Sequence, residues 1–113
     1  MNQIKNSITL IGHLGRDPEV IQTRNGNTLA NLSLATNEVY RNQKGEKIIN
    51  TEWHRCIAWG KLAELMASMC KKGKEVVIRG KLTYNSYEDK DGVRRKTSQI
   101  VVNDFVVLGK SRD

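Results

Sequence analysis

The sequence predicts an all-β domain, a barrel of five strands with one α-helix between the third and fourth strands. Most apolar residues alternate with polar ones, the period of a strand with one buried face. One stretch has helical spacing instead, and strand-like segments precede and follow it. At 113 residues, the chain is long enough for one such domain and too short for two. We assign residues 1–109 to the domain and residues 110–113 to a short basic C-terminal end.

Turn signals separate the strand-like segments. Asp17-Pro18 ends the first segment, and Asn25-Gly26 and Asp91-Gly92 are strong signals for hairpin turns. The polar stretch at residues 41–47 predicts a mobile loop. The predicted strand segments are residues 8–14, 20–23, 29–35, 48–59, 75–88, 93–102 and 105–108.

The predicted helix covers about residues 61–72. Its apolar residues recur at i, i+3, i+4 and i+7, which gives one stripe that packs on the barrel. Lysines near its C-terminal end suit the helix dipole, and Gly73 suits a left-handed position directly after the helix. The stripe consists of Leu62, Leu65, Met66 and Met69. This order of elements is what a five-stranded Greek-key OB-fold barrel requires.

The composition is basic and globular. Nineteen Lys and Arg against twelve Asp and Glu give a net charge of +7. A surplus of this size on a small domain favours a polyanionic partner such as a nucleic acid. Many basic proteins bind no polyanion, so charge by itself leaves both interpretations open.

Other function classes find little support in the sequence. Cys56 and Cys70 form no CxxC pair, so we expect no metal site, and two lone cysteines fit a reducing compartment. There is no secretory h-region and no apolar segment of about 18 residues, so we expect a cytoplasmic protein without membrane contact. His13 and His54 carry no nucleophile–base signature and no Walker loop occurs, so we expect neither a cofactor nor enzyme activity.

The segment at residues 51–59 carries the most informative pattern. Residues two apart in a strand share a face, which puts both tryptophans with an arginine on one side and small residues on the other. With the small residues inward, the indoles and the guanidinium form a stacking platform for bases. With the tryptophans inward, they belong to the core and the arginine side chain extends past them to solvent. Alternation alone does not decide between these two orientations. The first set is Trp53, Arg55, Ile57 and Trp59, and the second is His54, Cys56 and Ala58.

The tyrosines lie in or beside predicted turns. Tyr40 precedes the polar loop. Tyr84 and Tyr87 lie on the second long hairpin with different parity, so at most one shares a binding face. The return strand carries three consecutive cations, and such a run of charge in a protein is usually only a solvent-exposed surface. Beside tyrosines they fit a phosphate-contacting arm better; they are Arg94, Arg95 and Lys96.

Four sequence blocks resemble the bacterial single-stranded DNA-binding protein family. They stand in the family's order, and the similarity extends over about residues 4–108. The block that joins the Trp53-His54-Arg55 strand to the helix entry is the most specific. The blocks are ITLIGHLGRDPE at 8–19, ANLSLAT at 30–36, TEWHR at 51–55 and WGKLAE at 59–64. The resemblance implies an OB-fold, a homotetramer, and binding of single strands without sequence preference.

The resemblance also implies roles for individual residues. Trp53 matches a base-stacking tryptophan, and Trp59 falls where the family stacks an aromatic residue, more often phenylalanine. Tyr40 and Tyr87 stand where many members carry tryptophan, so stacking on a smaller ring is expected. His54 matches a position near the subunit interface. The implied phosphate-binding positions are Arg55, Lys61 and Lys72, to which charge and hairpin placement add Arg94, Arg95 and Lys96.

Family members typically continue into a flexible linker and a short acidic tail that recruits replication and repair enzymes. This sequence ends in a basic stretch at residues 109–113, so recruitment through such a tail is not expected. The predicted function is sequence-independent binding and protection of single-stranded DNA in replication, recombination and repair. Two alternatives stay open: an assembly factor for replication restart, and an RNA-binding OB module.

Overall fold

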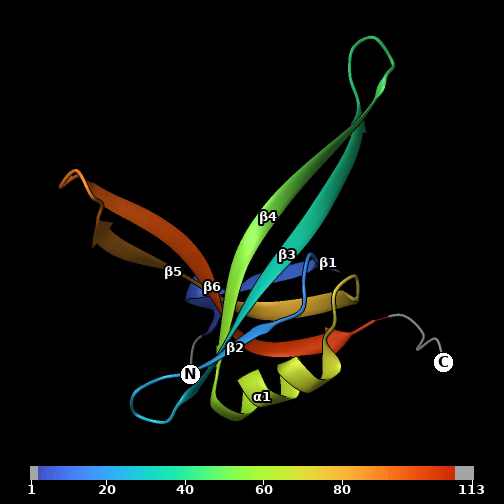
Figure 1. Ribbon diagram of the computed structural model, residues 1–113. Helices are drawn as coiled ribbons and strands as arrows, with labels where there is room; N and C mark the ends of the chain where they lie inside the picture. The colour runs from blue at the N-terminus through green and yellow to red at the C-terminus, as the bar shows by residue number, and fades with distance from the viewer. Residues whose placement is uncertain (1–2, 109–113) are drawn as a thin grey trace.

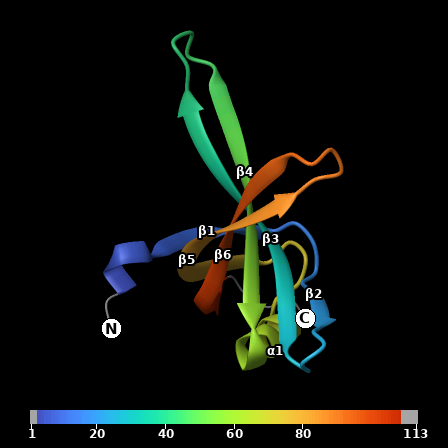
Figure 2. The ribbon, with the colours of Figure 1, turned by 90° about the vertical axis from the view of Figure 1, so that its left-hand side faces the viewer.

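The computed structural model describes residues 3–108 as a small β-barrel from which two long hairpins project. The helix lies at one end of the barrel, and both hairpins leave from the other end in both views (Figures 1 and 2). The predicted C-terminal end at residues 110–113 lies outside the described residues. The elements are η1 (Gln3–Asn6), β1 (Ile8–Leu14), β2 (Glu19–Gln22), β3 (Thr28–Arg41), β4 (Lys47–Trp59), α1 (Gly60–Met69), β5 (Glu75–Glu88) and β6 (Arg94–Val107).

Five strands close the barrel. Their order is β1-β5-β6-β4-β3, and β3 pairs back on β1. Neighbours are antiparallel except β4 and β6, which run parallel and pair only at Cys56–Ile100 and Ile57–Val101. The short β2 pairs with β3 outside the closed ring. This is the predicted Greek-key OB-fold, with α1 between the third and fourth barrel strands.

Alternate residues of each barrel strand point inward, as the period-two pattern predicts. Gly12 and Gly80 lie close to the backbone of a neighbouring strand, and a Cβ atom at either position would collide with the carbonyl group of Ala35 or Val101. The core consists of Leu14, Ala30, Leu32, Leu34, Cys56, Ala58, Ala63, Met66, Cys70, Val76, Ile78, Ile100 and Val102.

The helix ends earlier than predicted. It stops at Met69, and Cys70 is extended with φ −103° and ψ 132°. Lys71 and Lys72 therefore lie in a turn instead of the last helical turn. Gly73 does have the predicted positive φ, 86°, but inside that turn and not directly after the helix.

The predicted apolar stripe of α1 is also partly wrong. Ala63 and Met66 are fully buried, whereas Leu65 and Met69 are about half exposed. The buried positions Ala63, Met66 and Cys70 recur at i, i+3 and i+7, so the packed face is rotated from the predicted one. The small side chain of Ala63 suits a helix that lies close to the barrel.

The loop predicted at residues 41–47 is reduced to a turn at residues 42–46, because Arg41 ends β3 and Lys47 begins β4. Strands β3 and β4 continue far beyond the barrel, and Arg41 still pairs with Lys47. At the tip, the Asn42 carboxamide oxygen accepts the backbone N–H groups of Lys44 and Glu46, each at 2.9 Å. This Asx-type turn closes the hairpin. We call residues 36–52 the β3–β4 arm and residues 83–99 the β5–β6 arm.

A carboxylate ties the turn after α1 to the end of β1. The Lys72 N–H donates to Asp17 Oδ1 at 2.7 Å, and the Gly73 N–H donates to the Leu14 carbonyl at 2.8 Å. Within residues 3–108, no helix has the length and apolar character needed to cross a membrane.

Replacing Asp17 with alanine should destabilise the protein, because the Lys72 N–H loses a charged acceptor. We expect the free energy of unfolding in urea to fall by about 1–2 kcal/mol. Glu19→Ala, which removes an exposed carboxylate two residues away, is the control and should change it by less than about 0.5 kcal/mol. Equal losses in the two variants would contradict the proposed tie.

The two free cysteines are buried, and burial raises the pKa of Cys56 to about 12 and the pKa of Cys70 in the same direction. We expect iodoacetamide at pH 8.5 to modify both thiols far faster in denaturant than in the native protein.

Unfolded thiols ionise from about pH 9 and the folded Cys56 thiol only near pH 12, so the free energy of unfolding falls as the pH rises between these values. Cys56→Ala should flatten this alkaline decline in stability; an unchanged decline would argue against a buried neutral thiol.

Candidate nucleic-acid interface

Strand β4 presents both tryptophans on the outside of the barrel. Trp53 is 61% exposed and Trp59 is 45% exposed, whereas Cys56 and Ala58 are buried in the core. Arg55, on the same face as the tryptophans, is exposed. Burial thus decides the question that alternation left open: the small residues point inward, and the indoles and the guanidinium point outward.

Ile57 shares this outer face but is only 6% exposed, unlike its neighbours in the predicted platform. At this position β4 has a strand on each side, and Ile57 pairs with Asn31 of β3 and Val101 of β6. Trp53 and Trp59 lie beyond the two positions where β6 accompanies β4. The platform is therefore divided into two aromatic sites, six residues or about 20 Å apart along the strand.

Gly15 provides the support on which Trp53 lies. A Cβ atom on residue 15 would come within 2.5 Å of Trp53 Cζ3 and 2.8 Å of Cη2. The Gly15 N–H donates to the Ser33 carbonyl at 2.9 Å, which fixes the backbone beneath the ring. The indole is thus held against backbone on one side and remains open to solvent elsewhere, as a stacking surface requires.

Two grooves meet at Trp53, His54 and Arg55. One lies on the outer face of β3 and β4, and the other lies among β1, β4, β5 and β6. Arg16 lines the first groove, and sequence reasoning missed it; its one signal is its place directly after Gly15. The first groove is further lined by Glu19, Asn31, Leu32 and Ser33, and the second by Ile8, Leu10, Leu82, Ser98, Gln99 and Ile100.

Arg16, Lys72 and Lys61 come from three different parts of the chain. Asp17, adjacent to Arg16 in sequence, accepts the N–H of Lys72. This contact brings the predicted Lys72 next to the loop that carries Arg16, which shares a groove with Arg55. Lys61 is exposed in the first turn of α1, two residues after Trp59.

Tyr40 lies near the tip of the β3–β4 arm and is exposed. It pairs with Ile48, which is five residues from Trp53 on β4. An odd separation places Tyr40 on the opposite face of the ribbon from Trp53. The four predicted stacking residues therefore do not form one plane.

Both tyrosines of the β5–β6 arm are exposed, on opposite faces as predicted. Lys96 Nζ lies 5.3 Å from the ring centroid of Tyr84 on one face. Tyr87 lies directly opposite Arg95 on the other face. The three consecutive cations are consequently divided between two faces, with Arg94 and Lys96 on the Tyr84 side.

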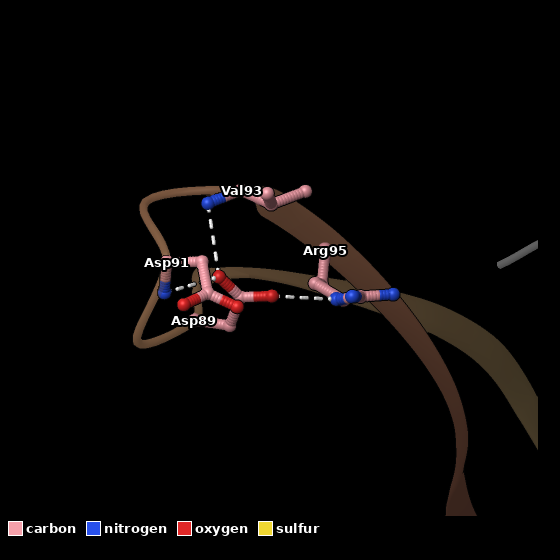
Figure 3. Close-up of polar contacts among 4 residues, drawn as sticks. All are labelled: Asp89, Asp91, Val93 and Arg95. Carbon is pink, nitrogen blue, oxygen red and sulfur yellow. Dashed lines mark hydrogen bonds and ion pairs between the residues drawn. The ribbon is translucent and has the colours of Figure 1, made fainter.

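Asp89 organises the tip of this arm (Figure 3). Its carboxylate accepts the N–H groups of Asp91 at 3.0 Å and Val93 at 2.9 Å, and its Oδ2 pairs with Arg95 Nε at 2.8 Å. The hydrogen bond from Arg95, followed by that from Val93, lowers the pKa of the Asp89 carboxyl. Sequence reasoning missed Asp89, although an Asp two residues before Asp-Gly is a signal for an Asx turn.

His54 is half-buried between the two arms and borders both grooves. Its Nε2 atom lies 2.9 Å from the Thr36 hydroxyl. Its role at a subunit interface stays a prediction. Among residues 3–108, no group of three or more His, Cys, Asp or Glu side chains is arranged to hold a metal ion.

Comparison with known proteins places this geometry in a family. The model of the single-strand binding protein family matches residues 5–108. Single-stranded DNA-binding protein 1 of Chlorobaculum tepidum is 43% identical over 105 residues, covering 92% of this chain and 65% of the relative. The single-stranded DNA-binding protein of Neisseria meningitidis serogroup A is 40% identical over 104 residues, covering 92% and 60%. The chain thus spans 60–65% of the length of these curated relatives.

Solved structures agree with the sequence comparison. A single-stranded DNA-binding protein of Plasmodium falciparum in complex with single-stranded DNA superposes with a TM-score of 0.83 at 28% identity, covering 92% of this chain and 95% of that one. A deletion mutant of the Thermus aquaticus protein superposes with a TM-score of 0.79 at 26% identity, covering 92% and 50%. From its fold, its outward aromatic face and these similarities, the chain belongs to the single-strand binding protein family.

Proposed function

We propose that this protein binds single-stranded DNA without sequence preference and protects it during replication, recombination and repair. The observation that carries the proposal is Trp53, an indole 61% exposed, supported by Gly15 and flanked by Arg16 and Arg55. An exposed indole beside two guanidinium groups offers a stacking face for a base and cations for the adjoining phosphates. The names of the relatives and the complex with single-stranded DNA support the same function.

The chemistry follows from which groups a single strand exposes. Unpaired bases offer π-faces to Trp53, Trp59, Tyr40 and Tyr87, and every base has such a face, so stacking tolerates any sequence. The cations neutralise phosphates and release counterions. The proposed phosphate-binding residues are Arg16, Arg55, Lys61, Lys72, Arg94, Arg95 and Lys96.

We propose a homotetramer in the bacterial cytoplasm, at the nucleoid. An apolar row crosses the outer face of three strands, where Ile11 pairs with Val77 and Val77 with Val106. Ile11 and Val106 are exposed in the single chain, and a neighbouring subunit would cover them. Analytical ultracentrifugation should give four times the chain mass, and Ile11→Arg should give a smaller species; a monomer at micromolar concentration would contradict the proposal.

Titration of the intrinsic tryptophan fluorescence with oligo-dT tests the function directly. Base stacking on Trp53 and Trp59 should quench the emission, and the affinity should fall steeply with salt. A parallel titration with oligo-rU tests the RNA-binding alternative. Absence of quenching, or affinity independent of salt, would contradict single-strand binding and leave a protein-contact role in replication restart as the better explanation.

Trp53→Ala should weaken binding of a labelled oligo-dT, measured by anisotropy, by about 1–3 kcal/mol because one base loses its stacking surface. Gly15→Ala should act in the same direction, since its methyl group displaces the indole. Leu65→Ala, which removes an exposed apolar side chain on α1, is the control and should bind as the unsubstituted protein does. Equal affinities of the three variants would mean that Trp53 does not contact the DNA.

Arg16→Gln tests the groove cation that sequence reasoning missed. If Arg16 contacts one phosphate, the slope of log Kd against log salt should decrease by about 0.7, the value for one contact on a single strand. Arg24→Gln, a change of equal charge in the β2–β3 turn, should leave the slope unchanged. Equal slope changes would mean that net charge alone matters.

A further inference from the structure

Arg95 is the one predicted phosphate ligand that an acidic side chain holds in place among the described residues of its arm. The pair joins Nε to Asp89 Oδ2 at 2.8 Å, and the side chains of Arg95 and Asp89 are 59% and 20% exposed. Asp89 cannot easily swing away, because two backbone N–H groups of the turn also bind its carboxylate. The carboxylate is therefore a fixed support and Arg95 is the side chain that it orients.

The contact uses only one edge of the guanidinium. Nε faces the carboxylate, and Figure 3 shows the guanidinium extending from that atom away from the turn. The two terminal nitrogens keep four N–H donors, which match phosphate oxygens in geometry and charge. An arginine bound in this way can bind a phosphate without breaking its bond to Asp89.

The oriented cation also lies beside an aromatic ring. Arg95 is the cross-strand partner of Tyr87, with Cβ atoms about 5 Å apart in such pairs. A base stacked on Tyr87 and a phosphate on Arg95 would belong to the same or adjacent nucleotides. Lys96 and Tyr84 repeat the combination on the other face, with no carboxylate in their contact.

We propose that Asp89 is a positioning residue for DNA binding, which orients Arg95 toward the phosphate of a nucleotide stacked on Tyr87. The proposal rests on the proposed single-strand binding. It predicts a change in DNA affinity opposite to the one that charge alone would cause. Removing a negative charge from a DNA-binding surface ordinarily strengthens binding; removing this one should weaken it, because a free Arg95 must be ordered anew for each contact.

Asp89→Asn separates the two effects. The carboxamide oxygen can still accept the Asp91 and Val93 N–H groups, so the turn is retained while the ion pair is lost. Glu88→Gln removes a neighbouring exposed carboxylate and serves as the charge-matched control. In anisotropy titrations with oligo-dT at low salt, Asp89→Asn should bind about three- to fivefold more weakly than Glu88→Gln. Equal or tighter binding by Asp89→Asn overturns the proposal.

A double-mutant cycle assigns the effect to Arg95. In an Arg95→Ala background, adding Asp89→Asn should not weaken binding further; a loss of the same size there would mean that Asp89 acts through the turn, which overturns the proposal. If the unsubstituted protein binds no oligo-dT, the proposed function itself fails, and this inference with it. If it binds and only the comparison with Glu88→Gln fails, the proposed function stands without the positioning role.

Discussion

The short parallel contact between β4 and β6 determines most of the molecule's shape. It closes the barrel at Cys56–Ile100 and Ile57–Val101 and then ends, so the two strands separate and each continues into a hairpin with its antiparallel partner. The two arms diverge for this reason (Figure 2). Where β6 accompanies β4, Ile57 is buried, whereas Trp53 and Trp59, at the two ends of this seven-residue segment, are exposed.

Much of the fold was predictable because it depends on local patterns. Period-two alternation located the barrel strands, Asn25-Gly26 located the first hairpin, and helical spacing located α1. The helix face was not predictable in the same way, since Leu65 and Met66 are equally apolar and only the position of the barrel decides which is buried. The length of the β3–β4 arm was not predicted either. Its two strands pair only with each other, and their residues are exposed on both faces, so the sequence has no apolar alternation there.

The candidate site likewise contains residues that local patterns predict and residues that only the folded chain brings together. Outward tryptophans could be anticipated from alternation once the small residues Cys56 and Ala58 were taken as inward. Arg16 could not, because it joins Arg55 only when the end of β1 folds back toward β3. The pairing of Arg95 with Asp89 crosses a hairpin turn, and a run of three cations does not reveal which of them is paired.

The distribution of aromatic residues suits the proposed ligand, a long flexible single strand. Trp53 and Trp59 share a face of β4, Tyr40 lies on the opposite face of its arm, and Tyr87 lies on a second arm. A flat platform would suit a rigid, stacked ligand, whereas a single strand bends at every nucleotide and can follow surfaces that turn. Trp53 shares a groove with Arg16 and Arg55, and Tyr87 pairs with Arg95. Under the proposed function, a base and a neighbouring phosphate would be bound together at each of these two sites. The sequence independence in the proposed function would follow from this geometry, since stacking on an aromatic ring requires no particular base edge.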